Sequence, residues 1–208
     1  RLINGKQLYD IQNDRGQKQN VAEEHLEVVE DLMAQYEMYW QELGQMAYPH
    51  ARPVIGSPFQ DVTWLNTISW VKSDESPHSW NQRHVLAGDT LSGFWPVEIA
   101  RSGVYQFDVR RWPEEIEHPI RDSLPAQTAG DISMFGQPFL KGAGRAIAVD
   151  KVILKVGDRQ VEQEIAESDV NALFEMQLNK GLTDVQSWFC TSAGDSLAAY
   201  YVYVRLVE

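Results

Sequence analysis

Alternation of apolar and polar residues is the feature that most constrains the fold of this chain. Across residues 104–112, Tyr105, Phe107 and Val109 share one face of an extended strand, and polar residues such as Gln106 and Asp108 occupy the other. A period of two is typical of a strand with one buried face. The sequence therefore predicts an antiparallel sheet packed against a core on one side.

Further segments from residue 62 onward have the length and composition of short strands. Gly181 and Gly194 fall between the last of them as turn signals, and residues 113–144 read as a long irregular excursion with several Pro and Gly. The predicted strands are residues 64–71, 94–100, 104–112, 146–156, 172–178, 185–191 and 199–207. Short strands at this spacing predict a mainly β fold, an antiparallel, jelly-roll-like β-sandwich. Tyrosines on both faces of the last strand predict that it is covered on both sides.

The first part of the chain has a different pattern. Asn4-Gly5 is a strong hairpin turn signal between two short apolar segments. Asn20 and Glu23 have capping-box spacing, and Gly44 is a stop signal, so an amphipathic helix is expected between them. Its apolar residues at helical spacing are Leu26, Val29, Leu32, Met33, Tyr36, Trp40 and Leu43. The predicted organisation is a hairpin-plus-helix subdomain over residues 1–46, a linker over 47–61 and a sandwich over 62–208, with a helical stripe too large for the hairpin alone to cover.

Charge limits the partners of this chain. The formal net charge is −12, which disfavours nucleic acid and anionic membranes as partners, although a local basic patch could still bind a sulfated ligand. No apolar run approaches the roughly 18 residues that a membrane span needs. The chain opens at Arg1 without an initiator Met, so we expect that it has been cut from a larger precursor.

A family resemblance appears in the first 43 residues. The pieces that carry it are Gln7-Leu8-Tyr9-Asp10-Ile11, Asn13-Asp14-Arg15-Gly16 and Asn20-Val21-Ala22, followed by the amphipathic helix. They resemble the C-terminal subdomain of bacterial arylsulfatase-type sulfatases of the alkaline-phosphatase superfamily, with Arg15 where the family usually has Pro. The remainder is similar to a domain appended to some bacterial sulfatases, through Gly93-Phe94-Trp95-Pro96, Arg110-Arg111-Trp112-Pro113 and Tyr200-Tyr201-Val202-Tyr203, among other stretches.

The resemblance implies a parent protein that hydrolyses sulfuric esters, and a fragment that is not an enzyme on its own. The family's nucleophile is a formylglycine made within a C/S-x-P-x-R motif, and Cys190 is followed by Thr191-Ser192-Ala193-Gly194, which lacks both the Pro and the Arg. The missing catalytic domain is therefore an expected partner, its calcium is expected there, and no cofactor is expected in this fragment. A periplasmic or extracellular location is also implied.

Aromatic residues near polar ones are the strongest candidates for a binding site, because sugars stack on aromatic rings. Trp80 lies in a polar segment beside Asn81, and Trp112 follows Arg110 and Arg111, whose guanidinium groups suit a sulfate or carboxylate. These five residues are the predicted carbohydrate-binding set. The alternative is that Trp80 and Trp112 close the ends of the sandwich or contact the helical subdomain.

Other reactive side chains have simpler explanations. Cys190 sits in an alternating strand, which favours a small buried residue over a nucleophile. The five histidines match no zinc spacing. Glu114, Glu115 and Glu117 fit a solvated acidic loop better than a glycosidase pair.

Three hypotheses follow from the sequence. The first is a non-catalytic accessory domain that helps to hold a carbohydrate, sulfated or not. The second is a structural module that stabilises the parent fold or its oligomer. The third, an independent glycosidase-like enzyme, has no motif in its favour.

Overall fold

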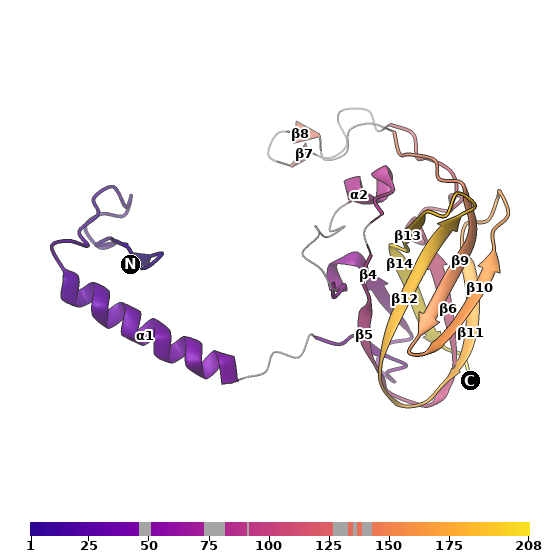
Figure 1. The fold of residues 1–208 in the computed structure, drawn as a ribbon, viewed down its shortest axis with the longest axis horizontal. Coiled ribbons are helices and arrows are strands. Elements are labelled where there is room, and N and C mark those ends of the chain that lie inside the picture. Colours follow the sequence, from indigo (N-terminus) through magenta and orange to yellow (C-terminus); the bar gives the residue numbers. More distant parts are fainter. Residues whose placement is uncertain (46–50, 73–81, 91, 127–132, 135–136, 139–142) are drawn as a thin grey trace. The chain divides into compact units, whose positions relative to one another are not determined.

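The computed structural model describes residues 1–208 except for 46–50, 73–81, 91, 127–132, 135–136 and 139–142 (Figure 1). The chain divides into two compact units, Arg1–Pro49 and His50–Glu208. The fold is mainly β: an antiparallel sandwich preceded by a small hairpin and a long helix, as the alternation predicted.

The first unit begins with the predicted hairpin. Strands β1 (Leu2–Ile3) and β2 (Gln7–Leu8) pair antiparallel around a turn. Asn4 and Gly5 have φ angles of 51° and 66° there. Both values lie in the left-handed region that Asn and Gly tolerate best, which is why this dipeptide forms the turn.

The helix α1 (Leu26–Gln45) starts later than its predicted cap. Asn20 is wrong as the N-cap, because its side-chain oxygen accepts hydrogen bonds from the backbone N–H groups of Leu8 and Ala22 and so ties the hairpin to the following turn. The apolar stripe lies largely open: Leu26, Tyr36 and Trp40 are all exposed. The hairpin covers only part of it, since Leu32 and Met33 are half-buried beside the hairpin turn.

The second unit contains two sheets. The six-stranded sheet has the order β10-β9-β12-β5-β3, with β13 also paired to β12; the four-stranded sheet has the order β11-β6-β14-β4. In the first, the strands are β3 (Val54–Ile55), β5 (Trp95–Ile99), β9 (Val149–Val156), β10 (Arg159–Glu164), β12 (Gly181–Thr191) and β13 (Ser196–Ala198). In the second they are β4 (Val62–Asn66), β6 (Gly103–Arg110), β11 (Ala172–Leu178) and β14 (Tyr201–Leu206). Every described pairing in these sheets is antiparallel except that of β3 with β5.

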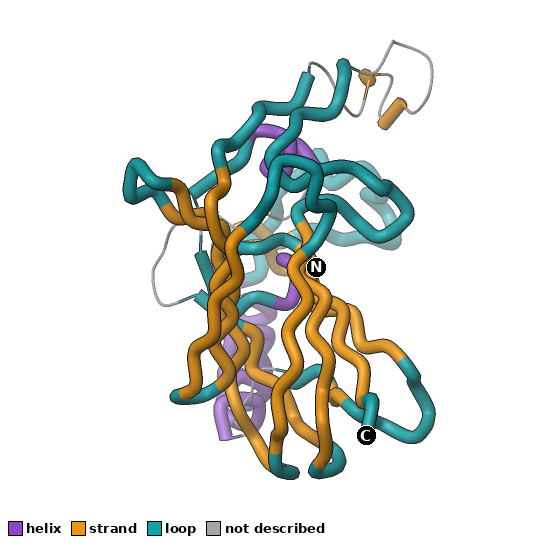
Figure 2. The backbone as a smooth tube through the Cα atoms, turned by 90° about the vertical axis from the view of Figure 1, so that its right-hand side faces the viewer, coloured by secondary structure: helices purple, strands orange, loops and turns teal. Residues whose placement is uncertain are grey.

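One hydrophobic core lies between the sheets, whose strands form two groups in Figure 2. Alternate residues of β6, including Phe107 and Val109, face alternate residues of β9 and β12, including Leu154 and Phe189, and all four are fully buried. Burial of large apolar side chains from both sheets is the main stabilising contribution to such a sandwich.

Two predictions about organisation need correction. The segment 47–61 is not wholly a linker, because β3 pairs with β5 and Ile55 is fully buried in the core. The strand β10 was missed, because its alternation is between half-buried and exposed side chains at a sheet edge and carries no strong apolar signal.

The remaining elements lie outside the two large sheets. The described part of residues 113–144 holds only the two-residue strands β7 (Ser133–Met134) and β8 (Gln137–Pro138), which matches the predicted irregular excursion. A 3₁₀ turn, η1 (Thr67–Ser69), follows β4, where Asn66 caps it through a bond from the Ile68 N–H. A short helix, α2 (Gln82–Ala87), precedes β5.

Candidate functional site

Arg111, a predicted carbohydrate contact, lies instead in a buried cluster of hydrogen bonds. The Arg111 side chain is fully buried, and its two terminal nitrogens lie within hydrogen-bond distance of the carbonyl oxygens of Val85, Ile120, Asp122 and Arg145. Burial lowers the pKa of Arg111 to about 10, which still leaves it charged at neutral pH. This guanidinium therefore binds backbone from three separate segments and not a ligand. We call this group the Arg111 cluster.

Trp112 belongs to the same cluster. Only 1% of its surface is exposed, its indole N–H donates to the Pro119 carbonyl at 3.0 Å, and the Arg111 guanidinium lies 4.3 Å from its ring centroid. A cation over an indole face stabilises both groups when they are buried. The prediction of sugar contact through Arg111 and Trp112 is wrong in this structure. Arg111 continues the inward phase of Phe107 and Val109, whereas the phase that placed Trp112 outside ends with β6 at Arg110.

Of the other three predicted site residues, the structure describes only Arg110. Arg110 lies on the outer face of β6, but its Nε is 3.0 Å from each carboxylate oxygen of Asp108. It is thus held by an internal ion pair. Trp80 and Asn81 lie outside the described residues.

The outer face of the four-stranded sheet combines aromatic and polar side chains. Register places Trp64, Tyr203 and Asp108 in one row across three strands, and Asn66, Tyr201 and Arg110 in the next row. We call the outward side chains of β4, β14 and β6 the Trp64 face; its members are Val62, Trp64, Asn66, Tyr201, Tyr203, Arg205, Val104, Gln106, Asp108 and Arg110.

Trp64 presents the largest open aromatic surface on this face. It is 51% exposed, and its ring stacks beside Tyr201 and Tyr203 at interplanar angles of 14° and 8°. The two tyrosines are themselves buried. Their hydroxyls are held by Gln82, which donates to Tyr201, and by the backbone N–H of Glu114, which donates to Tyr203. Burial raises the pKa of both tyrosines, so the face carries neutral phenols under ordinary conditions.

A small hollow adjoins Trp64. Its volume is about 90 Å³, and it is lined by Trp64, Asn66, Thr67, Ile68, Gln82, Val85 and Tyr201. Its walls therefore mix aromatic and apolar surface with amide and hydroxyl groups. An open indole beside hydrogen-bonding side chains is the arrangement that suits a polar ligand with an apolar face.

Trp64 is not a core residue, and it was not among the binding residues predicted from the sequence. The signal that could have found it is the strand phase: Thr63 and Leu65 are the buried residues of β4, so Trp64 must point outward. Sequence could not show that Tyr201 and Tyr203 would lie beside it, because that depends on the pairing of β14 with β4.

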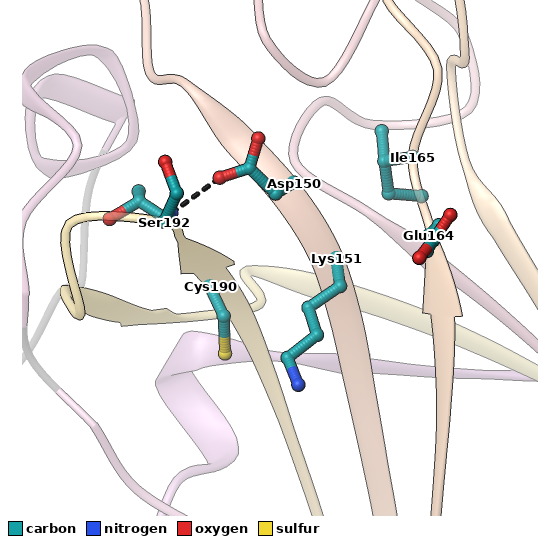
Figure 3. A pocket seen from close by; sticks show the side chains of 7 residues that line it. Asp150, Lys151, Glu164, Ile165, Cys190 and Ser192 are labelled. Atoms are coloured by element: carbon teal, nitrogen blue, oxygen red, sulfur yellow. Dashed lines mark hydrogen bonds between the residues drawn. The ribbon is translucent and has the colours of Figure 1, made fainter.

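Cys190 lies in a polar hollow on the opposite sheet, of about 370 Å³ (Figure 3). It faces Lys151 across the β12–β9 pairing. Burial raises the pKa of the thiol, so it stays protonated and a poor nucleophile at neutral pH. The alternation predicted a small buried residue here, and Cys190 is instead half-buried.

The remaining candidates form no evident catalytic group. Glu114, Glu115 and Glu117 are exposed in the loop after Trp112, and Glu114 lies 3.6 Å from Arg205. Among the described residues, no three His, Cys, Asp or Glu side chains are grouped as metal ligands. In the same part of the chain, no helix is long and apolar enough to cross a membrane.

Comparisons with known proteins give little further guidance. No family model and no curated protein matches the chain. A crystal structure of a ruminal GH26 endo-beta-1,4-mannanase is similar over 57% of this chain and 18% of that chain, with 14% sequence identity and a TM-score of 0.30. A likeness this low bears on neither fold nor function.

Proposed function

We propose that this chain is the non-catalytic C-terminal part of a sulfatase-like protein and that its sandwich binds carbohydrate through the Trp64 face. The observation that carries the binding role is the open Trp64 ring, flanked by two coplanar tyrosines and by amide and charged side chains. The sulfatase relationship rests on the motifs of the first 43 residues. An extracytoplasmic location and a catalytic partner domain belong to the same proposal.

The Trp64 ring has two roles on this face. Part of it stacks on Tyr201 and Tyr203, and the exposed half leaves apolar surface open for contact with a ligand. The rigid support matters because a ring whose plane is already fixed loses little entropy when a sugar stacks on it. Asn66 and Gln82 line the hollow at the ring's side, where their amides can meet hydroxyl groups in addition to their bonds with Ile68 and Tyr201.

The test is calorimetric titration of the whole chain with a panel of polysaccharides. Trp64→Ala should weaken binding at least about tenfold, which corresponds to about 1.4 kcal/mol. The matched control is Trp188→Ala, which removes an indole from the outer face of the other sheet and should leave affinity unchanged. Equal losses in both variants, or no saturable binding of any glycan by the wild type, would overturn the proposal.

The second candidate, a structural module, is favoured by one observation: the exposed apolar stripe of α1. Leu26, Tyr36 and Trp40 are each more than half exposed, which in water is unfavourable for so many large side chains on one helix. If this candidate holds, the chain self-associates or binds its parent through α1. Sedimentation of a Tyr36→Ser, Trp40→Ser double variant should then show loss of association, while unchanged sedimentation would exclude self-association through the stripe.

A further inference from the structure

The two arginines of the Trp64 face already lie beside carboxylates of this chain. Arg110 is bonded to Asp108, and Arg205 lies 3.6 Å from Glu114. Asp108 also accepts a hydrogen bond of 2.9 Å from the Asn171 side chain. Each of these two arginines therefore already has a carboxylate partner before any ligand arrives.

A sulfate group at this face would have to compete with Asp108 and Glu114 for these arginines. Asp108 is only 5% exposed, so taking Arg110 from it would leave a buried carboxylate with a single amide donor. Leaving a buried charge unpaired costs several kcal/mol, which is more than an exposed sulfate contact returns. The net charge of −12 adds long-range repulsion of a polyanion.

The aromatic part of the face suits an uncharged ligand. The exposed ring of Trp64 offers apolar surface, and the hollow beside it offers amides and a hydroxyl from Asn66, Gln82 and Thr67. Such a surface matches a pyranose ring, which has apolar C–H faces and hydroxyl groups at its edge. Ring stacking and neutral hydrogen bonds gain nothing from a sulfate.

We infer that the Trp64 face recognises an uncharged pyranose chain and discriminates against its sulfated form. This inference rests on the proposed carbohydrate-binding function and narrows its ligand class. The sequence suggested a sulfated glycan because of Arg110 and Arg111. In the structure, Arg110 is paired with Asp108 and Arg111 is bonded to backbone, so we replace that ligand with an uncharged one.

The experiment compares matched pairs of ligands on the whole chain. Neutral gluco-, manno- and galacto-oligosaccharides are titrated beside chemically sulfated forms of the same backbones. The neutral form should bind at least about tenfold more tightly than its sulfated partner, and its affinity should not change between about 0.05 M and about 0.5 M NaCl, since no ion pair is formed. Tighter, salt-sensitive binding of the sulfated form that Trp64→Ala abolishes would overturn the inference while leaving the carbohydrate-binding function intact. No binding of either form would overturn both.

A charge variant tests the cause of the discrimination. Glu114→Gln frees Arg205 and should raise the affinity for the sulfated ligand. Glu175→Gln removes the same charge from the same side of the sheet, but from β11, which is two strands from β14. A larger gain in Glu114→Gln than in Glu175→Gln supports neutralisation of the arginine as the reason; equal gains would mean that only net charge matters and would overturn the argument from pairing.

Discussion

The Arg111 cluster and the Trp64 face both combine tryptophan with arginine, yet the fold uses them in opposite ways. In the cluster, the guanidinium binds carbonyl oxygens and the indole is buried beneath it. On the face, the arginines are bound by carboxylates and the indole is open. The difference teaches that residue type does not separate a structural site from a binding surface; the partners of each polar group do.

The largest loss of stability should come from Arg111→Met. Removing this guanidinium leaves buried carbonyls in three segments without their donor, so the free energy of unfolding should fall by about 3 kcal/mol. Urea denaturation of the whole chain measures this. Arg159→Met is the control, because Arg159 is exposed and donates only to the Gln177 carbonyl; its loss should stay under about 1 kcal/mol. Equal losses of stability in the two variants would mean that the Arg111 cluster does not stabilise the fold more than an exposed hydrogen bond does.

The next effect is alkaline destabilisation through Tyr200. This residue is fully buried, its hydroxyl donates to the Asp89 carbonyl at 3.0 Å, and burial raises its pKa well above the ordinary value of 10. The folded state therefore holds this proton more tightly than the unfolded state. Its contribution to stability is full below about pH 10 and is lost as the pH rises toward the raised pKa, by about 1.4 kcal/mol for each pH unit.

Comparison with Tyr200→Phe isolates this contribution. The variant should be less stable than the wild type near neutral pH, because it lacks the bond to Asp89, but it should lose stability less steeply above about pH 10. Denaturant titrations at several alkaline pH values give both slopes. Parallel slopes would show that other tyrosines, such as Tyr105, carry the alkaline transition.

The smallest effect on stability should come from Trp64→Ala. Half of this side chain is already in solvent and the rest stacks on Tyr201 and Tyr203, so the free energy of unfolding should fall by only about 1 kcal/mol, while carbohydrate affinity falls at least about tenfold. Arg111→Met should show the reverse: a large loss of stability and no change in affinity in the folded fraction. A Trp64→Ala variant as unstable as Arg111→Met would remove the contrast between the two regions.

Sequence reasoning succeeded where the pattern is local. The hairpin at Asn4-Gly5 follows from the backbone preferences of two residues, and the inner face of β6 follows from its alternation. It failed at strand ends. Trp112 lies two residues beyond β6, so the strand phase that predicted its exposure no longer applied, and its ring is buried. Arg111 has the same phase as Phe107 and Val109, so the alternation alone could have predicted that it faces inward.

The sequence by itself determined the mainly β fold, the hairpin, the long amphipathic helix, the double-sided burial of the last strand and the absence of a sulfatase nucleophile motif around Cys190. Each depends on short-range periodicity or on neighbouring residues. Only the tertiary structure decided that Trp64 lies beside Tyr201 and Tyr203, that Arg111 binds backbone and that the arginines of the face are paired. These contacts join strands and loops far apart in the chain, and their energies depend on pairing register and burial, which no local pattern encodes.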